Sequence, residues 1–364
     1  MRRTLYFTAP QEVEIREEPL PVLQDDEVLV ETTCSAISAG TEMLVYQGRF
    51  PRGFETDSVI SSLRGGFEYP LAYGYACVGV VRETGKQVDP ALRDKFVFSF
   101  QPHTSHFIIP PSALILLPEA ISPETACFLP NMETAVNLVQ DGAPILGERV
   151  LVLGQGVLGL LTASLLREFP LERLVTADRF ELRRRASQAI GVDAVLEGGG
   201  SGKWKVESEQ KTGMASVSGD QLSSQQMPSE SHFTPQSAYA QNFDLAFELS
   251  GSPAALDDAI SMTAFSGRIV VGSWYGGKKT PIDLGGAFHR SRIKLISSQV
   301  STVAPELSGR WDKGRRFGVA WEALGRIQPQ KWVTHRFPIE EAGQAYRLLD
   351  ENPQETIQIL LEYS

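Results

Sequence analysis

The six residues GQGVLG, from Gly154 to Gly159, constrain the fold more than any other feature of the 364-residue sequence. They form a G-x-G-x-x-G motif between a short apolar segment at 149–153 and a longer apolar segment at 157–169. In such a motif the first glycine permits a tight turn, the second lets a pyrophosphate approach the backbone, and the third lets helix and strand pack closely. The motif therefore predicts a strand, a dinucleotide-binding turn and a helix.

The sequence after this motif continues to alternate between strand and helix patterns. Further apolar strands are predicted at residues 173–178, 243–251, 267–274 and 293–300. A helix over 181–190 is expected to end at Gly191, and Ser252 is placed to cap a later helix that has Pro253 in its first turn. Strands joined by helices predict an α/β domain with a parallel, doubly wound sheet, which is the Rossmann fold.

The cofactor residues are predicted from this sheet, because ligands bind at the carboxyl ends of its strands. Asp178 ends the second strand, where a carboxylate can accept the ribose hydroxyls of NAD and would repel the 2′-phosphate of NADP. The adjacent Arg179 can accommodate that phosphate, so NAD is favoured and NADP stays open. The predicted cofactor residues are Gly154, Gln155, Gly156, Val157, Leu158, Gly159, Asp178, Arg179, Ser250, Gly251, Gly272, Ser273 and Ser298. The alternative is a glycine turn that binds no dinucleotide.

Composition and charge narrow the possible partners and compartment. The net charge is −10, and the densest basic run, 183–185, is interpreted as the solvated face of a helix, so neither nucleic acid nor an anionic membrane is an expected partner. The chain shows no charged-then-apolar leader and no apolar run of about 18 residues, so a cytoplasmic location is expected. Cys34, Cys77 and Cys127 form no CxxC pair, so neither a disulfide framework nor a structural zinc site is predicted.

The segment 198–240 interrupts the alternation. It is dominated by serine, glycine and glutamine and has almost no apolar periodicity. Such a composition buries too little apolar surface to offset its ordering entropy, so we interpret it as a mobile surface insertion. A linker is favoured over a partner-binding or regulatory role.

Several segments together resemble the medium-chain dehydrogenase/reductase superfamily over nearly the whole chain. They are SAISAGTE (35–42), YPLAYGYACVGVVRETG (69–85), LPEAISPETACFLPNMETAVN (117–137), VLVLGQGVLG (150–159), FELSGSPAAL (247–256), GRIVVGSW (267–274) and FPIEEAGQAYRLLD (337–350). SAISAGTEMLVYQGRFP, PNMETAVN and FHRSRIKLISSQVS look most like the branch that includes bacteriochlorophyllide a dehydrogenase.

This resemblance implies a GroES-like, β-rich catalytic domain built from both chain ends around the Rossmann domain. We expect the first part of the catalytic domain at 1–125, the Rossmann domain at 126–300 and the return to the catalytic domain at 301–364. The superfamily also implies a homodimer joined through the nucleotide-binding sheets. Thr134, in the segment entering the Rossmann domain, is expected to face the nicotinamide.

The catalytic zinc of many relatives has no credible ligands in this chain. The positions of the zinc-binding cysteine and histidine fall on Ser38 and Tyr75, and the cysteine-rich structural zinc lobe is missing. We therefore predict that the protein binds no metal. Without zinc, a side chain must share the proton transfer, or the substrate must already be activated by conjugation.

Four residues are candidates for that proton transfer. The Tyr75 phenol could donate to a substrate oxygen, or the ring could only fill space. Thr41 falls near the superfamily's proton-relay hydroxyl, or it could bond the backbone in a turn. Glu42 and Glu133 could act as bases if buried, or they could pair with an arginine or cap a helix.

Three functions are compatible with these residues. The favoured one is a zinc-independent, NAD(P)-dependent oxidoreductase that interconverts a secondary alcohol and a ketone on a small-molecule substrate. The second is an NAD(P)H-dependent reductase of a conjugated C=C bond, of the enone or quinone type. The third is a catalytically silent protein that binds NAD(P)H and acts as a sensor or partner protein.

Overall fold

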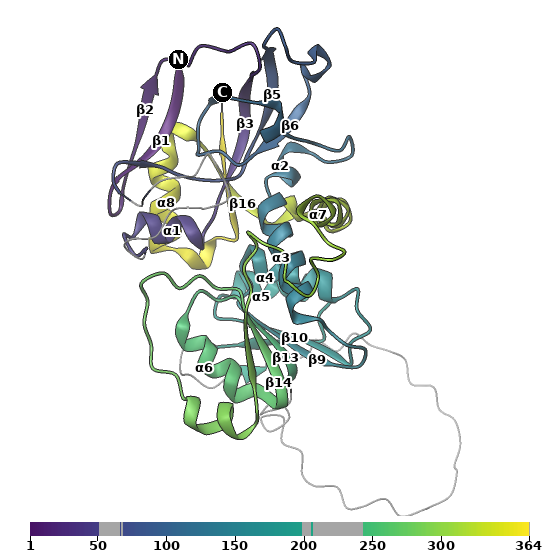
Figure 1. Ribbon diagram of the computed structural model, residues 1–364. Coiled ribbons are helices and arrows are strands. Elements are labelled where there is room, and N and C mark those ends of the chain that lie inside the picture. The colour runs from purple at the N-terminus through teal and green to yellow at the C-terminus, as the bar shows by residue number, and fades with distance from the viewer. Residues whose placement is uncertain (51–65, 67, 199–204, 207–242, 364) are drawn as a thin grey trace, which may run out of the picture.

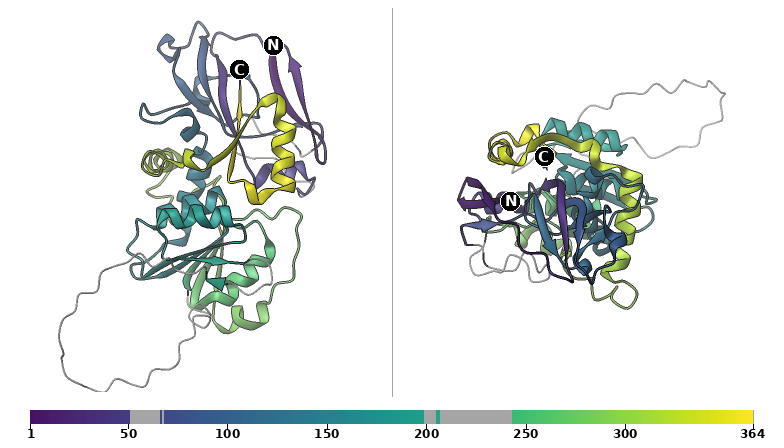
Figure 2. Two further views of the ribbon diagram at one scale, coloured as in Figure 1. Left: turned by 180° about the vertical axis from the view of Figure 1, so that it is seen from behind. Right: turned by 90° about the horizontal axis from the view of Figure 1, so that it is seen from above.

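The computed structural model describes residues 1–50, 66, 68–198, 205–206 and 243–363, which form two lobes (Figure 1). One lobe is rich in β-structure and contains both chain ends, and the other contains the central sheet with helices on its faces (Figures 1 and 2). The predicted α/β fold with a β-rich domain and a Rossmann domain is therefore confirmed. In the described ranges, no helix combines the length and the apolar character needed to cross a bilayer.

The Rossmann sheet has seven strands in the order β12-β11-β10-β9-β13-β14-β15. Its strands are β9 (Arg149–Leu153), β10 (Arg173–Asp178), β11 (Ala194–Glu197), β12 (Lys205–Val206), β13 (Phe243–Glu248), β14 (Thr263–Val271) and β15 (Lys294–Ser297). All neighbours pair in parallel except β12, which is antiparallel to β11. The strand order reverses between β9 and β13, where doubly wound sheets bind their ligands.

Alternating side chains of this sheet form two cores. Val150 and Val152 of β9 join one core with α3 (Leu129–Gly142) and α4 (Val157–Leu166). Leu151 and Leu153 point to the other face, where they pack in a core with α6 (Pro253–Met262). α5 (Glu181–Ile190) packs on the first face (Figure 1). Alternate residues of β9 face opposite sides of the sheet, and both sides are covered by an apolar core. The segment 149–153 therefore has no polar face.

Both ends of the chain build the β-rich lobe. One sheet has the order β16-β17-β3-β5-β6-β8, with β7 also paired to β3, and a second has the order β2-β1-β4. The C-terminal strand β17 pairs antiparallel with β3, from Ile359 opposite Ile37 to Glu362 opposite Cys34. The last strand of the chain therefore belongs to the main sheet of this lobe.

The remaining elements have the following bounds. The strands are β1 (Arg2–Ala9), β2 (Glu12–Glu18), β3 (Val28–Ile37), β4 (Leu71–Ala72), β5 (Cys77–Thr84), β6 (Phe96–Ser99), β7 (His106–Ile109), β8 (Ile115–Leu116), β16 (Val333–Pro338) and β17 (Gln358–Glu362). The helices are α1 (Thr41–Tyr46), α2 (Pro123–Ala126), α7 (Lys313–Ile327) and α8 (Ala342–Glu351), and the short helical turns are η2 (Pro90–Leu92), η3 (Pro111–Ala113), η4 (Leu284–Phe288), η5 (Pro329–Trp332), η6 (Ile339–Glu341) and η7 (Pro353–Glu355).

Three local predictions need correction or lie outside the structure. The first Rossmann helix ends at Leu166 rather than at residue 169, whereas the predicted left-handed end at Gly191 is confirmed (φ 85°). Ser252 precedes α6, but its side chain does not cap the helix. The predicted insertion at 198–240 lies outside the described residues, except for Gly198 and the two residues of β12.

The basic run 183–185 is not a solvated face. Arg184 is buried and donates to the backbone carbonyls of Asp178 and Arg179. Arg183 donates to the carbonyls of Pro353 and Thr356 in the β-rich lobe. Of the three, only Arg185 projects into solvent. The prediction failed because a guanidinium group has five donors, which can satisfy buried carbonyls as well as water.

Candidate functional site

A buried carboxylate–imidazole pair lies at the centre of the β-rich lobe. Glu42, in the first turn of α1, is fully buried, and its Oε2 lies 2.9 Å from His103 Nε2. The Tyr346 hydroxyl donates to the same oxygen over 2.5 Å, and the Ser38 backbone N–H donates to Oε1 over 2.9 Å. Each oxygen of this buried carboxylate therefore has a partner, as a charge removed from water requires.

Gly74, in the segment 69–85 that resembles the superfamily, makes room for this pair. Its φ of +128° is a backbone conformation that residues with a side chain rarely adopt. A Cβ atom at this position would lie 2.7 Å from His103 Cδ2. The glycine before Tyr75 thus makes room for the buried His103 ring, a residue that the sequence analysis did not single out.

Tyr75 is one of the predicted proton donors. Its hydroxyl donates to Ser38 Oγ over 2.6 Å, so the two residues at the former zinc-ligand positions are hydrogen-bonded to each other. Although the side chain as a whole is half-buried, burial of the phenol raises the pKa of Tyr75 to about 12, and the negative charge of Glu42 adds to this rise. Hydrogen bonding to Ser38 and Thr41 partly offsets it. The phenol is therefore a neutral hydrogen-bond donor at physiological pH.

The donor set around Tyr75 does not fit a zinc ion. Hydroxyl groups of serine and tyrosine are poor zinc ligands, and the nearby Glu42 and His103 bind each other. Among the residues that the structure describes, no three His, Cys, Asp or Glu side chains converge as metal ligands.

Glu133 lies in a different environment from Glu42 and is not available as a base. It is buried on α3, and its Oε1 accepts two hydrogen bonds from Arg316 of α7, at 3.1 and 2.7 Å. Arg316 is itself fully buried and also donates to Asn137 Oδ1 over 2.6 Å. Of the three predicted roles for Glu133, namely a base, a partner of an arginine and a helix cap, the geometry favours pairing with an arginine. Sequence analysis did not single out Arg316, because nothing in α7 marks its partner on α3.

The glycine loop between β9 and α4 has the geometry of a phosphate cradle. A Cβ on Gly159 would lie 1.9 Å from the Gly154 carbonyl oxygen, and a Cβ on Gly154 (φ +91°) would lie 2.6 Å from the backbone of Ser250. At Gly156, which precedes the first turn of α4, a Cβ would meet only Arg183 Nη1, at 3.9 Å. The first and third glycines thus permit close backbone packing, and the second leaves open space at the positive end of a helix.

Gly159 permits a direct test of this loop. Gly159→Ala is expected to weaken NADH binding about tenfold or more, because the clash with Gly154 must be relieved by moving the loop backbone, at a cost of about 1–3 kcal/mol. Titration of intrinsic or NADH fluorescence measures the effect. Gly309→Ala is the matched control, because nothing lies within 4 Å of its Cβ position. Equal NADH affinity for both variants would mean that the loop does not cradle the cofactor.

Asp178 and its neighbours lie beside this loop. The Asp178 carboxylate accepts the backbone N–H of Gln155 over 2.7 Å and that of Phe180 over 2.8 Å. It therefore holds the glycine loop in place and retains lone pairs for a ribose. Arg179 stacks on the Phe180 ring, with its Cζ 4.4 Å from the ring centroid, and Arg183 reaches the same ring from 4.9 Å. Arg179, which could accommodate the 2′-phosphate of NADP, thus shares one aromatic ring with Arg183.

The loops after β13 and β14 complete the carboxyl edge of the sheet. The Gly251 N–H donates to Ser273 Oγ over 2.9 Å, and Ser250 donates to the fully buried Glu248. The Tyr275 hydroxyl donates to the other oxygen of Glu248 over 2.5 Å. Sequence analysis missed both Glu248 and Tyr275, although an acidic residue at the end of an apolar strand is a signal that could have found them.

The other predicted cofactor residues are held by local contacts. Gly272 packs so closely against Leu138 and Leu249 that a Cβ would lie 2.6 Å from each. Ser298 accepts a hydrogen bond from Asn137, at 2.9 Å, and the Thr134 hydroxyl donates to the Pro130 carbonyl of its own helix. Gln155 is fully buried and donates to the carbonyls of Val152 and Gly154. Gln155 therefore supports the loop from inside.

Two contacts join the lobes at this edge. The Gly277 N–H donates to the Arg49 carbonyl over 2.8 Å, and a Cβ on Gly276 would lie 3.2 Å from the Leu44 side chain of α1. The helix that carries Thr41 and Glu42 therefore packs against the loop that follows β14. This contact brings the candidate catalytic residues and the carboxyl edge of the Rossmann sheet to the same interface.

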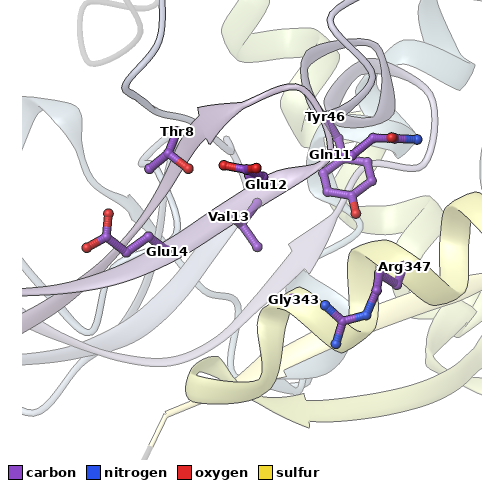
Figure 3. A pocket seen from close by; sticks show the side chains of 8 residues that line it. All are labelled: Thr8, Gln11, Glu12, Val13, Glu14, Tyr46, Gly343 and Arg347. Carbon is purple, nitrogen blue, oxygen red and sulfur yellow. The ribbon is translucent and has the colours of Figure 1, made fainter.

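A separate cavity of about 430 Å³ lies elsewhere in the β-rich lobe (Figure 3). It is lined by Thr8, Gln11, Glu12, Val13, Glu14, Tyr46, Gly343 and Arg347. Its side chains come from the first two strands, their connection, α1 and α8, and they include none of the candidate catalytic or cofactor residues. We therefore assign it no part in the site.

Comparisons with known proteins agree with this arrangement. The chain is 20% identical over 381 residues to the starvation-sensing protein RspB of Escherichia coli K12, covering 100% of this chain and 99% of that protein. It is 26% identical to the L-threonine 3-dehydrogenase of Saccharopolyspora erythraea, over 63% of this chain and 55% of that enzyme. These similarities support the predicted relation of the chain to the medium-chain dehydrogenase/reductase superfamily. No family model matches the sequence.

Solved structures show the same fold at lower sequence identity. The crystal structure of the alcohol dehydrogenase RspB of E. coli CFT073, in complex with NADH, has a TM-score of 0.71 and 16% identity and covers 99% of both chains. The 2R,3R-butanediol dehydrogenase of Bacillus subtilis has a TM-score of 0.71 and 15% identity and covers 100% of this chain and 99% of that chain. The predicted fold is therefore confirmed, whereas none of these relatives tests the zinc-free branch.

Proposed function

We propose that the protein is an NAD(P)-dependent oxidoreductase that interconverts a secondary alcohol and a ketone without zinc. The observation that carries the proposal is the contact between α1 and the loop after β14, because it sets the Tyr75, Ser38 and Glu42 cluster beside a dinucleotide-binding edge. The alcohol and polyol dehydrogenases among the similar proteins support the alcohol–ketone reaction. Structures of relatives that hold NADH or NADP support the cofactor class.

The residues have separate roles in this proposal. The loop from Gly154 to Gly159 would hold the pyrophosphate, and Asp178 would accept the adenosine ribose hydroxyls. Bound NAD(P)H would supply a hydride to the carbonyl carbon. The Tyr75 hydroxyl, which donates to Ser38 in the structure, would turn its hydrogen to the carbonyl oxygen of the substrate and then give up the proton. The Ser38 hydroxyl would then donate to the phenol oxygen and stabilise it. The proposal also includes a homodimer, and NAD as the favoured cofactor with NADP as the alternative.

Ketones and enones distinguish this function from its nearest alternative. NADH absorbance should fall in the presence of cyclic and side-chain ketones and stay constant with enones that have a hindered carbonyl. Oxidation of NADH by the enone panel alone would instead indicate a C=C reductase. Binding of NADH with no turnover on either panel would indicate the sensor role.

Tyr75→Phe tests the proton donor. Turnover of the best ketone is expected to fall about 100-fold, the lower end of what a positioned acid contributes, while NADH affinity stays at the wild-type value. Because the pKa of Tyr75 is raised to about 12, the wild-type phenol stays protonated across the assay range. Wild-type turnover should therefore show no loss between pH 8 and pH 10 from titration of this group, whereas an ordinary phenol would be half ionised at about pH 10. Unchanged turnover in Tyr75→Phe would mean that the ring only fills space.

A further inference from the structure

A line of hydrogen bonds leads from Glu42 to a second surface cavity. His103 Nε2 lies 2.9 Å from Glu42 Oε2, and His103 Nδ1 lies 2.7 Å from Ser35 Oγ. Ser35 Oγ in turn lies 2.7 Å from the Tyr363 hydroxyl. We propose that Glu42, His103, Ser35 and Tyr363 form a proton relay that connects the active site with solvent. This inference rests on the proposed function, because it assigns Glu42 to the reacting site.

Tyr363, which follows β17, lines a cavity of about 440 Å³. Two carboxylates, Glu124 and Glu362, line the same cavity and can exchange protons with water. Tyr363 is half-buried, whereas Ser35, His103 and Glu42 are fully buried. The four residues therefore run from the interior of the lobe to a residue that lines a cavity, and burial raises the pKa of the Tyr363 hydroxyl well above its usual value.

Every hydrogen-bond donor of the relay can donate toward Glu42. Tyr363 can donate to Ser35, Ser35 to Nδ1 of a neutral His103, and His103 Nε2–H to Glu42. When a proton binds the Tyr363 oxygen, the Tyr363 hydrogen passes to Ser35 and the Ser35 hydrogen passes to His103 Nδ1. The Nε2 hydrogen of His103 then passes to Glu42, which becomes a carboxylic acid that donates to Nε2. One proton enters and one is stored, and no electron is transferred. The reverse steps return the proton to solvent.

A relay is needed because Glu42 is sealed from water. Its other side-chain contact is the Tyr346 hydroxyl, and Tyr346 is fully buried, so this contact does not lead out of the protein. The carboxylate also acts on Tyr75 through its charge, which disfavours the phenolate. A proton delivered to Glu42 removes this repulsion at the moment when Tyr75 gives its own proton to the substrate. The relay thus lets the buried site balance its charge without admitting water.

Exchange of the His103 ring protons with water tests the relay without a substrate. In full-length protein labelled with ¹⁵N-histidine, Tyr363→Phe is expected to slow this exchange about 100-fold, because it removes the outer hydroxyl. Ser35→Ala should slow it similarly. Thr33→Val, at an exposed residue that lines the same cavity, should leave the wild-type rate. An unchanged rate in Tyr363→Phe would overturn the proposal.

This measurement separates the relay from the proposed reaction. If no ketone is turned over but Tyr363→Phe slows the His103 exchange, the proton path stands and the reaction class is wrong. If ketones are turned over, the solvent isotope effect on turnover should rise in Tyr363→Phe and stay at the wild-type value in Thr33→Val. Equal isotope effects in the two variants would show that the hydrogen-bonded line only holds the fold together.

Discussion

Replacing Arg316 by leucine is expected to lower the free energy of unfolding by about 3–5 kcal/mol. The guanidinium group is fully buried and donates to Glu133, to Asn137 and to backbone carbonyls of Val300 and Thr302. Its removal leaves the buried Glu133 carboxylate without a counter-charge and several acceptors without a donor. Chemical denaturation, followed by circular dichroism, measures the loss.

The exposed pair between Arg326 and Glu168 provides a matched control. It also joins a residue of α7 to the Rossmann domain, but both side chains are about half exposed. Arg326→Leu should therefore cost less than about 1 kcal/mol. The double variant Arg316→Leu with Glu133→Met should regain part of the loss, because no unpaired charge remains. A cost for Arg316→Leu as small as that for Arg326→Leu would contradict the buried ion pair.

Glu42→Leu is expected to cost at least about 3 kcal/mol of unfolding free energy, because it removes the acceptor of three buried donors, each worth about 1–3 kcal/mol when left unpaired. The donors are the Ser38 N–H, His103 Nε2 and the Tyr346 hydroxyl. Leucine fills a similar volume, so a lost cavity contributes little to the effect. Thermal and chemical unfolding of the purified variant measure it.

Glu42→Gln is the appropriate comparison for this variant. Glutamine keeps one oxygen acceptor but places an amide group opposite one of the donors, so an intermediate loss is expected. A stability of Glu42→Leu equal to that of the wild type would mean that the Glu42 network does not form in solution. The proton relay would then lose its inner end as well.

The local parts of the fold were predictable from sequence, since they depend on neighbouring residues. The glycines at 154 and 159, the strand end at Asp178 and the left-handed position of Gly191 each follow from backbone geometry within a few residues. The β-rich lobe was expected from its sequence texture and from the resemblance, and the C-terminal strand β17 pairs with β3 in its main sheet.

The contacts that define the candidate site depend on distant residues and could not be predicted in this way. His103 and Glu42 are 61 positions apart, and Arg316 and Glu133 are 183 positions apart. Their pairing requires the packing of β3 with its neighbours and of α3 with α7. For the same reason, the basic run 183–185 was misinterpreted, because the carbonyls that bind Arg183 lie in the last part of the chain.

The proposed function is the reduction of ketones with NAD(P)H and without zinc. The most direct test combines metal analysis of the purified protein with NADH oxidation before and after treatment with 1,10-phenanthroline. We predict no stoichiometric zinc and the same ketone turnover in both samples. The resemblance to the superfamily implies that Ser38 and Tyr75 stand at the zinc-ligand positions, and these poor zinc ligands are hydrogen-bonded to each other. One equivalent of tightly bound zinc, whose removal abolishes turnover, would contradict the account.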